Sequence, residues 1–228
     1  MEQNKTSTYL KYAMGEVALV MIGILLALQV NNWNEDRKLR NIEIKLLKEM
    51  LVDLQDQHAD VEFNMEHHLE GERSGRIVRE ALLNDLPFHD SLKTHFQQAY
   101  NFTILNNRRN AYNSLLSQGI DLISNDSLRS YISKYYEQGV PFQLEIQQVT
   151  VDLIRNTSVD HLELFKNMNW NSPLEPWDYE SLKTNRKYIA WLEFVNSNKS
   201  FEASAFENLK INNEKLTKDI IEELKRIE

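Results

Sequence analysis

Residues 12–30 read Tyr-Ala-Met-Gly-Glu-Val-Ala-Leu-Val-Met-Ile-Gly-Ile-Leu-Leu-Ala-Leu-Gln-Val, an apolar run that decides the fold. Glu16 is its only charged residue. Aromatic residues flank the run on both sides, as they do at bilayer interfaces: Tyr9, Tyr12 and Trp33. A helix over residues 12–33 rises roughly 31 Å at about 1.5 Å per residue, close to a hydrocarbon core about 30 Å thick. The run therefore predicts a transmembrane helix over residues 12–33.

Two other interpretations compete with a spanning helix. A cleaved signal peptide needs a site of small residues after the apolar run, and here the bulky polar stretch Gln29-Val-Asn-Asn-Trp-Asn-Glu35 follows instead. The run is also short for a span when counted strictly, so a buried helix of a soluble protein stays open. The aromatic flanks favour the bilayer.

The charges on the two sides of the run bear on membrane orientation. Lys5 and Lys11 precede it, and a larger set of basic residues follows it: Arg37, Lys38, Arg40, Lys45 and Lys48. A raw count of Lys and Arg places the C-terminal domain in the cytoplasm. Long domains, however, cross the membrane largely regardless of charge, whereas a short basic tail resists crossing. We therefore expect residues 1–11 in the cytoplasm and the C-terminal domain to be exported across the membrane.

The composition of the 228 residues describes the rest of the chain. A hydrophobic content of 42% and a charged content of 26% are ordinary for a folded protein. Six Gly and four Pro leave few breaks, which favours long helices. The chain has no cysteine, so it forms no disulfide and no thiolate site. A net charge of −8 lacks the basic field that nucleic-acid binding needs, so we expect no nucleic-acid partner.

A helical pattern continues directly from the apolar run. Apolar or neutral positions recur every three or four residues: Leu39, Ile42, Leu46, Met50, Leu54, His58, Val61 and Met65. No Gly or Pro lies between Leu28 and Glu70, so the transmembrane helix is expected to run straight into this one. Such a stalk either transmits motion between bilayer and domain or only supplies one helix of a bundle. The predicted fold is all-α, a transmembrane helix continuing into a helical bundle domain over residues 34–228.

Local signals divide this domain. Gly71 and Gly75 loosen the pattern before residues 77–83, which are either a second short helix or the end of the first. Predicted helix starts lie at residues 90–91 and 124–128, Gly119 ends a helix over 111–118, and residues 101–107 are either strand or loop. Breaks are predicted at 139–141 and 196–200. Residues 168–177 form a loop whose Trp170 and Trp177 either cover the core or contact a partner.

Two segments resemble a known family. Residues 12–35 combine the Gly15-Glu16 pair, Gly23 and the exit Asn31-Asn-Trp-Asn-Glu35, and residues 120–136 read Ile-Asp-Leu-Ile-Ser-Asn-Asp-Ser-Leu-Arg-Ser-Tyr-Ile-Ser-Lys-Tyr-Tyr. This pairing resembles an uncharacterised family of small single-pass membrane proteins of Gram-negative bacteria, most closely over the first 40 residues. The resemblance implies a bacterial inner membrane and a helical domain, and it implies no activity, cofactor or catalytic residue.

Catalytic and metal motifs are not found. The segment Gly71-Glu-Arg-Ser-Gly75 places its serine one position late for a nucleophile elbow. The nearest metal candidate groups His58, Glu62 and Glu66, with His67 and Glu70 beyond. The first three share a helix face, but a solvated charged stripe has the same spacing and further ligands from a second helix would be required. We predict no metal, no cofactor and no enzymatic activity.

Glu16 is the leading candidate for a functional residue. At about 100° per residue, Gly23 and Ala27 lie within roughly 20° of its face. A carboxylate and two small residues on one stripe are typical of a helix–helix contact in lipid, whereas an alternative is that Glu16 only reaches the headgroups.

The sequence therefore predicts a non-enzymatic, membrane-anchored helical interaction or sensory module. Its expected partners are the lipid bilayer and either a second copy or a membrane partner helix. The alternative is a subunit of an ion- or proton-conducting or force-transmitting membrane assembly, with Glu16 as the titrating group. A membrane-bound hydrolase is disfavoured because no nucleophile–base spacing is present.

Overall fold

The computed structural model describes the backbone of residues 3–169 and 171–228, and the side chains from Met14 onward except residues 158 and 170. All regular elements among these residues are helices, as the sequence predicted, and one antiparallel bridge joins Phe165 to Pro176. In chain order the elements are α1 (Gln3–Leu83), α2 (Leu92–Tyr100), α3 (Asn110–Gln118), the 3-10 turn η1 (Ile120–Leu122), α4 (Asp126–Lys134), the π-helical η2 (Tyr135–Gly139), α5 (Val140–His161), α6 (Tyr179–Thr184) and α7 (Arg186–Ile227).

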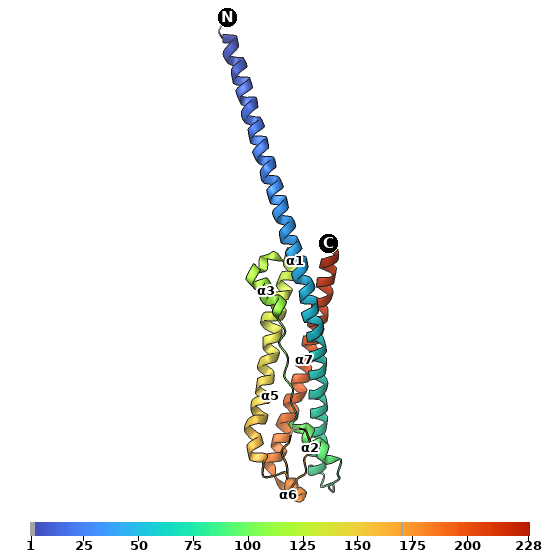
Figure 1. Ribbon diagram of the computed structural model, residues 1–228. Helices are drawn as coiled ribbons and strands as arrows, with labels where there is room; N and C mark the ends of the chain where they lie inside the picture. Colours follow the sequence, from blue (N-terminus) through green and yellow to red (C-terminus); the bar gives the residue numbers. More distant parts are fainter. Residues whose placement is uncertain (1–2, 170) are drawn as a thin grey trace.

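The N-terminal part of α1 projects away from the other helices (Figure 1). From Met14 to Asn32 every side chain is exposed, and the first buried one belongs to Glu43. By length and composition α1 could cross a membrane, and it is the one such helix among the residues described. We call residues 43–228 the helical body.

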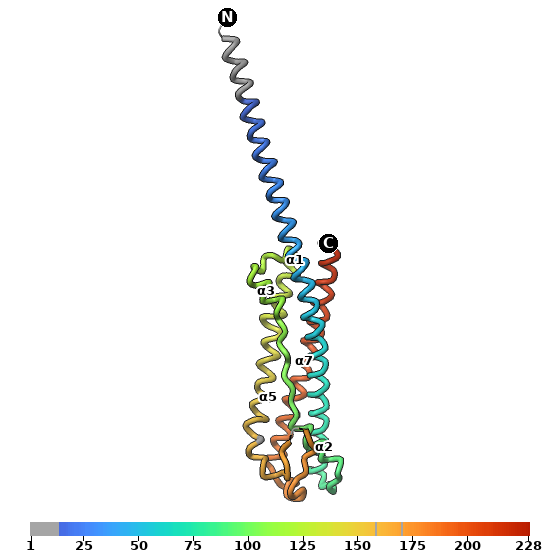
Figure 2. The backbone as a smooth tube through the Cα atoms, viewed as in Figure 1, coloured from blue at the N-terminus to red at the C-terminus, as the bar shows by residue number. Residues whose placement is uncertain are grey.

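Three long helices run side by side along the helical body: α1, α5 and α7 (Figure 1). The short helices α2 and α6 lie at its far end, whereas α3 and the C-terminus lie near the point where α1 emerges (Figure 1). Residues 101–109 form neither helix nor strand and run lengthwise between α2 and α3 (Figure 2). The anchor-side end is also joined by an ion pair of 2.7 Å between Lys48 Nζ and the Glu228 carboxylate.

The core consists of two apolar clusters, one at each end of the body. The anchor-side cluster packs α1 residues such as Leu47 and Leu54 against α7, α3 and α4. The far cluster is aromatic, with Tyr100 stacked on Trp191 at 4.4 Å between ring centroids. Buried α1 residues recur every seven positions at Leu47, Leu54, Val61 and His68, the repeat of two helices that pack with a left-handed twist.

Two of the predicted helix breaks are wrong. The chain does not break at residues 139–141, because the Val140 N–H bonds to the Tyr135 carbonyl and forms a wider π turn. Proline crowds the turn before it and lacks a donor, so a wider turn at this place lets α5 continue through Pro141.

The break predicted at residues 196–200 lies instead at Asn185, whose side chain accepts a hydrogen bond from the Tyr188 N–H and caps α7. Residues 196–200 continue α7 because Asn196 and Lys199 pack against α1 at Gly75 and Gly71. Both glycines therefore lie inside α1, which runs on to Leu83.

Candidate functional site

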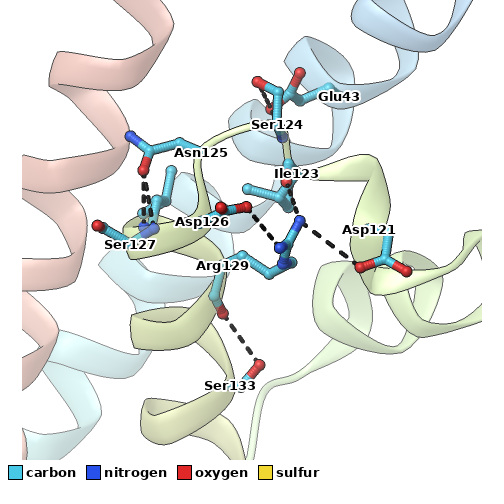
Figure 3. A network of polar contacts seen from close by, with 10 residues as sticks. Glu43, Asp121, Ile123, Ser124, Asn125, Asp126, Ser127, Arg129 and Ser133 are labelled. Atoms are coloured by element: carbon cyan, nitrogen blue, oxygen red, sulfur yellow. Dashed lines mark hydrogen bonds and ion pairs between the residues drawn. The ribbon is translucent and has the colours of Figure 1, made fainter.

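Polar contacts form a network where α1 enters the helical body, and Glu43, Asn125 and Arg129 belong to it (Figure 3). Glu43 is only 2% exposed, and its Oε1 accepts hydrogen bonds from the Ser124 N–H at 2.8 Å and from Ser124 Oγ at 3.0 Å. The next residue, Asn125, accepts from the Ser127 and Leu128 N–H groups and caps α4, which begins within the predicted helix start at residues 124–128. Glu43 therefore connects α1, at the point where this helix enters the body, to the loop that precedes α4.

The same loop contacts the end of α7. Asn125 Nδ2 donates to Glu223 Oε2 at 2.9 Å, and Arg226 Nε donates to that oxygen at 3.1 Å. Hydrogen bonds from Arg226 and then Asn125 hold the pKa of the buried Glu223 below its ordinary value, although burial raises it. A charged carboxylate thus joins α7 to the loop before α4.

Arg129 of α4 binds the loop that precedes this helix. Its guanidinium donates to the Ile123 carbonyl at 3.1 Å and lies between two carboxylates, 2.6 Å from Asp126 and 3.7 Å from Asp121 (Figure 3). Together these contacts connect α1, the loop, α4 and α7 at the end where the apolar helix emerges.

A cavity of about 590 Å³ opens beside this network, between α1 and the α3–α4 loop. Its lining is Asp36, Leu39, Arg40, Glu43, Gln118, Gly119, Asp121, Leu122 and Ser124. The residues from α1 share one side of that helix, because they are spaced by three or four positions.

A second polar cluster lies in the middle of the body, between the two apolar clusters. His68 Nδ1 is 2.7 Å from Glu202 Oε2, and both side chains are at most 1% exposed. Lys199, equally buried, donates to the Asn101 carbonyl, and burial lowers its pKa to about 8. Sequence reasoning missed this cluster. The signal was the seven-residue repeat, which places His68 in line with Val61 and hence in the core.

The sequence-predicted stripe lies on the projecting part of α1. Glu16, Gly23 and Ala27 are exposed, and no described atom outside the helix backbone lies within 4 Å of a Cβ built at Gly23. These three residues therefore have no packing partner among the described residues of this chain. Their role stays a prediction.

Of the three predicted aromatic anchors, the structure describes the side chain of Trp33. Trp33 is 63% exposed, with the Arg37 guanidinium 5.5 Å from its ring centroid. The side chains of Tyr9 and Tyr12 fall outside the described part of the chain.

The loop was predicted over residues 168–177, and the described residues 168, 169 and 171–177 lie outside any helix. Trp177 is 65% exposed, so it does not cover the core, and Leu174 fills that place instead. Trp170 lies outside the described residues, so its part in covering the core or contacting a partner stays a prediction.

His58 and Glu62, two residues of the metal candidate on α1, form ion pairs with α7. His58 Nε2 lies 3.1 Å from Glu214 Oε1, and Glu62 pairs with Lys210 of α7, which lowers the pKa of Glu62. Glu66 is exposed. Within residues 3–169 and 171–228, no group of three or more His, Asp or Glu is placed to hold a metal ion.

Fold and site define an all-α protein with one long apolar N-terminal helix that is tied to its body by buried polar contacts. The chain belongs to the family of unknown function DUF6090, whose model matches residues 16–151. The expectation of an uncharacterised family is thereby confirmed. The match begins at Glu16, includes Glu43 and the loop before α4, and ends inside α5. No curated protein and no solved structure matches the chain.

Proposed function

We propose that this chain is a single-pass protein of the bacterial inner membrane whose helical bundle lies in the periplasm. It acts as a non-enzymatic interaction or sensory module and associates through its anchor, residues 12–33, with a second copy or a partner helix. The observation that carries the proposal is α1, which passes without a break from an exposed apolar segment into the core of the body.

The exposed segment supports the bilayer as its surroundings. Between Met14 and Val30, eleven large apolar side chains are each more than half exposed. Burying one such side chain is worth roughly 1.5–3 kcal/mol, so leaving all of them in water forgoes about 15–30 kcal/mol. This exceeds the net stability of about 5–15 kcal/mol that a folded domain has. A hydrocarbon environment removes that cost.

The same helix favours force transmission as the second candidate function. The contact of Glu43 with Ser124 and that of Asn125 with Glu223 connect the exit of α1 to both α4 and α7. A tilt of the anchor would therefore move the whole anchor-side end of the body. Ion or proton conduction has Glu16 as its only candidate residue and no further observation to support it.

Membrane insertion and orientation are tested on the full chain in bacterial cells. We expect the protein to stay with membranes after alkaline carbonate washing, and external protease to digest the body in spheroplasts. Release by carbonate would refute insertion, and full protection would place the body in the cytoplasm.

Association through the anchor is tested with two matched variants. Gly23→Leu should weaken crosslinking between copies, because a large side chain holds helix backbones apart. Glu16→Gln keeps the shape and hydrogen bonding of residue 16 and should change crosslinking little. If Glu16→Gln instead abolishes function while association survives, titration of Glu16 is the role of the stripe.

A further inference from the structure

The cavity beside Glu43 lies at a defined distance from the end of the predicted span. At about 1.5 Å per residue, Asp36 lies roughly 4.5 Å and Arg40 roughly 10 Å beyond Trp33 along α1. A headgroup layer is roughly 5–8 Å thick, since a whole bilayer measures about 40–45 Å around a core of about 30 Å. The Asp36 end of the cavity therefore lies among headgroups, and the flexible side chain of Arg40 can reach back to them.

The charges of the cavity select the kind of headgroup. Arg40 is its one cation, and Asp36, Glu43 and Asp121 are its carboxylates. Among the described residues, Asp36 and Arg40 have no ion-pair partner within 4 Å, whereas Glu43 bonds to Ser124. The charge of Arg40 acts on the buried Glu223 only at longer range than an ion pair. A ligand that carries one phosphate and one ammonium complements both Arg40 and Asp36. The surplus of carboxylates opposes a headgroup with net negative charge.

The residue types further favour a primary ammonium. A primary ammonium donates hydrogen bonds to carboxylates, whereas a quaternary ammonium cannot and is usually held by aromatic rings. None of the residues that line the cavity is aromatic. A divalent cation is disfavoured, because the described residues contain no group of three ligands placed for a metal.

We propose that this cavity binds the headgroup of a phosphatidylethanolamine molecule of the surrounding bilayer. The Arg40 guanidinium contacts the phosphate, and Asp36 together with Asp121 contacts the ammonium. Leu39, which is exposed, and Leu122 provide apolar surface for the glycerol end of the lipid. This inference rests on the proposed membrane insertion, and it makes the bound lipid a third element of the junction that holds α1 against the α3–α4 loop.

Native mass spectrometry of the full chain tests the proposal. The protein is released from nanodiscs that contain equal amounts of phosphatidylethanolamine and phosphatidylcholine, and the lipids it retains are counted. We expect phosphatidylethanolamine to be enriched roughly tenfold, the effect of one hydrogen bond to a charged group. Asp36→Asn should bring the ratio of the two lipids close to one, because it removes an acceptor for the primary ammonium. Arg40→Gln should lower the retention of both lipids, because both carry the phosphate that Arg40 contacts.

Lys45→Gln is the matched control. Lys45 is exposed on the same helix, roughly 140° around from Arg40 at about 100° per residue, and pairs with Glu49 at 3.8 Å. This variant should retain the enrichment. Equal retention of both lipids by the wild-type protein, or loss of the preference in Lys45→Gln as well, would overturn the proposal.

Two further outcomes separate the possible failures. If soluble glycerophosphoethanolamine binds the detergent-solubilised protein and lipid retention shows no preference, the cavity takes a soluble ligand and the lipid is excluded. If the protein is washed from membranes by carbonate, the proposed function fails. If it stays in membranes without the lipid preference, only this inference fails.

Discussion

Replacement of Gly75 by alanine tests the closest approach of α1 and α7. A Cβ at this position would lie 2.9 Å from Asn196 Cγ and still nearer to Asn196 Oδ1. In a helix interior, alanine is favoured over glycine by about 1 kcal/mol. Overpacking of a filled contact costs about 1–3 kcal/mol. We therefore expect Gly75→Ala to lower the free energy of unfolding by about 1 kcal/mol.

Gly139→Ala supplies the matched control. Gly139 also has helical dihedral angles, but a Cβ there meets Leu209 Cδ1 at 3.7 Å and the Lys134 carbonyl oxygen at 4.0 Å, both ordinary contacts. This variant keeps the gain in helix propensity and should raise stability by about 1 kcal/mol. The two melting temperatures should then differ by roughly 4–8 °C, at about 2–4 °C per kcal/mol for a domain of this size.

The assay is thermal unfolding of the full chain in detergent, followed by far-ultraviolet circular dichroism. Asn196→Ala removes the atoms that the new methyl group would meet, and Asn196 Oδ1 has no hydrogen-bond partner to lose. The double variant Gly75→Ala/Asn196→Ala should therefore be about 1 kcal/mol more stable than Asn196→Ala alone, because only the gain in helix propensity remains. If Gly75→Ala stabilises the protein as much as Gly139→Ala does, the close contact between α1 and α7 is refuted.

Three more predictions concern the polar residues, each read from the same melting curves. Glu43→Ala should cost about 1.5–3 kcal/mol, because Ser124 loses a charged acceptor, whereas Glu43→Gln keeps an acceptor oxygen and should cost less. Burial lowers the pKa of His161 from 6.5 to about 4, so between these values the unfolded chain binds a proton that the folded chain does not. Stability should fall as pH falls from 6.5 to 4, and His161→Asn should make that fall less steep; an unchanged slope would contradict the assignment. Lys199→Met should cost about 1–3 kcal/mol because the Asn101 carbonyl loses its charged donor, whereas Lys199→Gln keeps a donor and should cost less.

Signals between neighbouring residues made most of the fold predictable. The continuous passage of α1 from the apolar run into the body follows from the absence of Gly and Pro between Leu28 and Glu70. The cap at Asn125 and the helix end at Gly119 are local signals, and both are present in the structure. In these places the neighbouring residues decide the conformation, so the sequence is sufficient.

The junction could not be predicted because its partners are far apart in the chain. Glu43 and Ser124 are separated by 81 positions, and Asn125 and Glu223 by 98. A glutamate in a charged stretch is normally solvated, and nothing local marks Glu43 as buried. For the same reason the sequence pointed to Glu16 in the anchor and not to the carboxylate that joins the anchor to the body.

The alternative left open after Gly71 and Gly75 and the wrong break at residues 196–200 have one common cause. Read separately, two glycines weaken a helix and a run of Asn, Ser and Lys breaks one. In the structure the two segments face each other, so that the missing side chains of the glycines make space for side chains of α7. The glycines leave room for Asn196 and for the buried stem of Lys199, and this contact keeps both helices continuous. Residues that disfavour a helix in isolation therefore mark the place where two long helices approach most closely. This is also where the buried His68–Glu202 pair joins the anchor helix to α7.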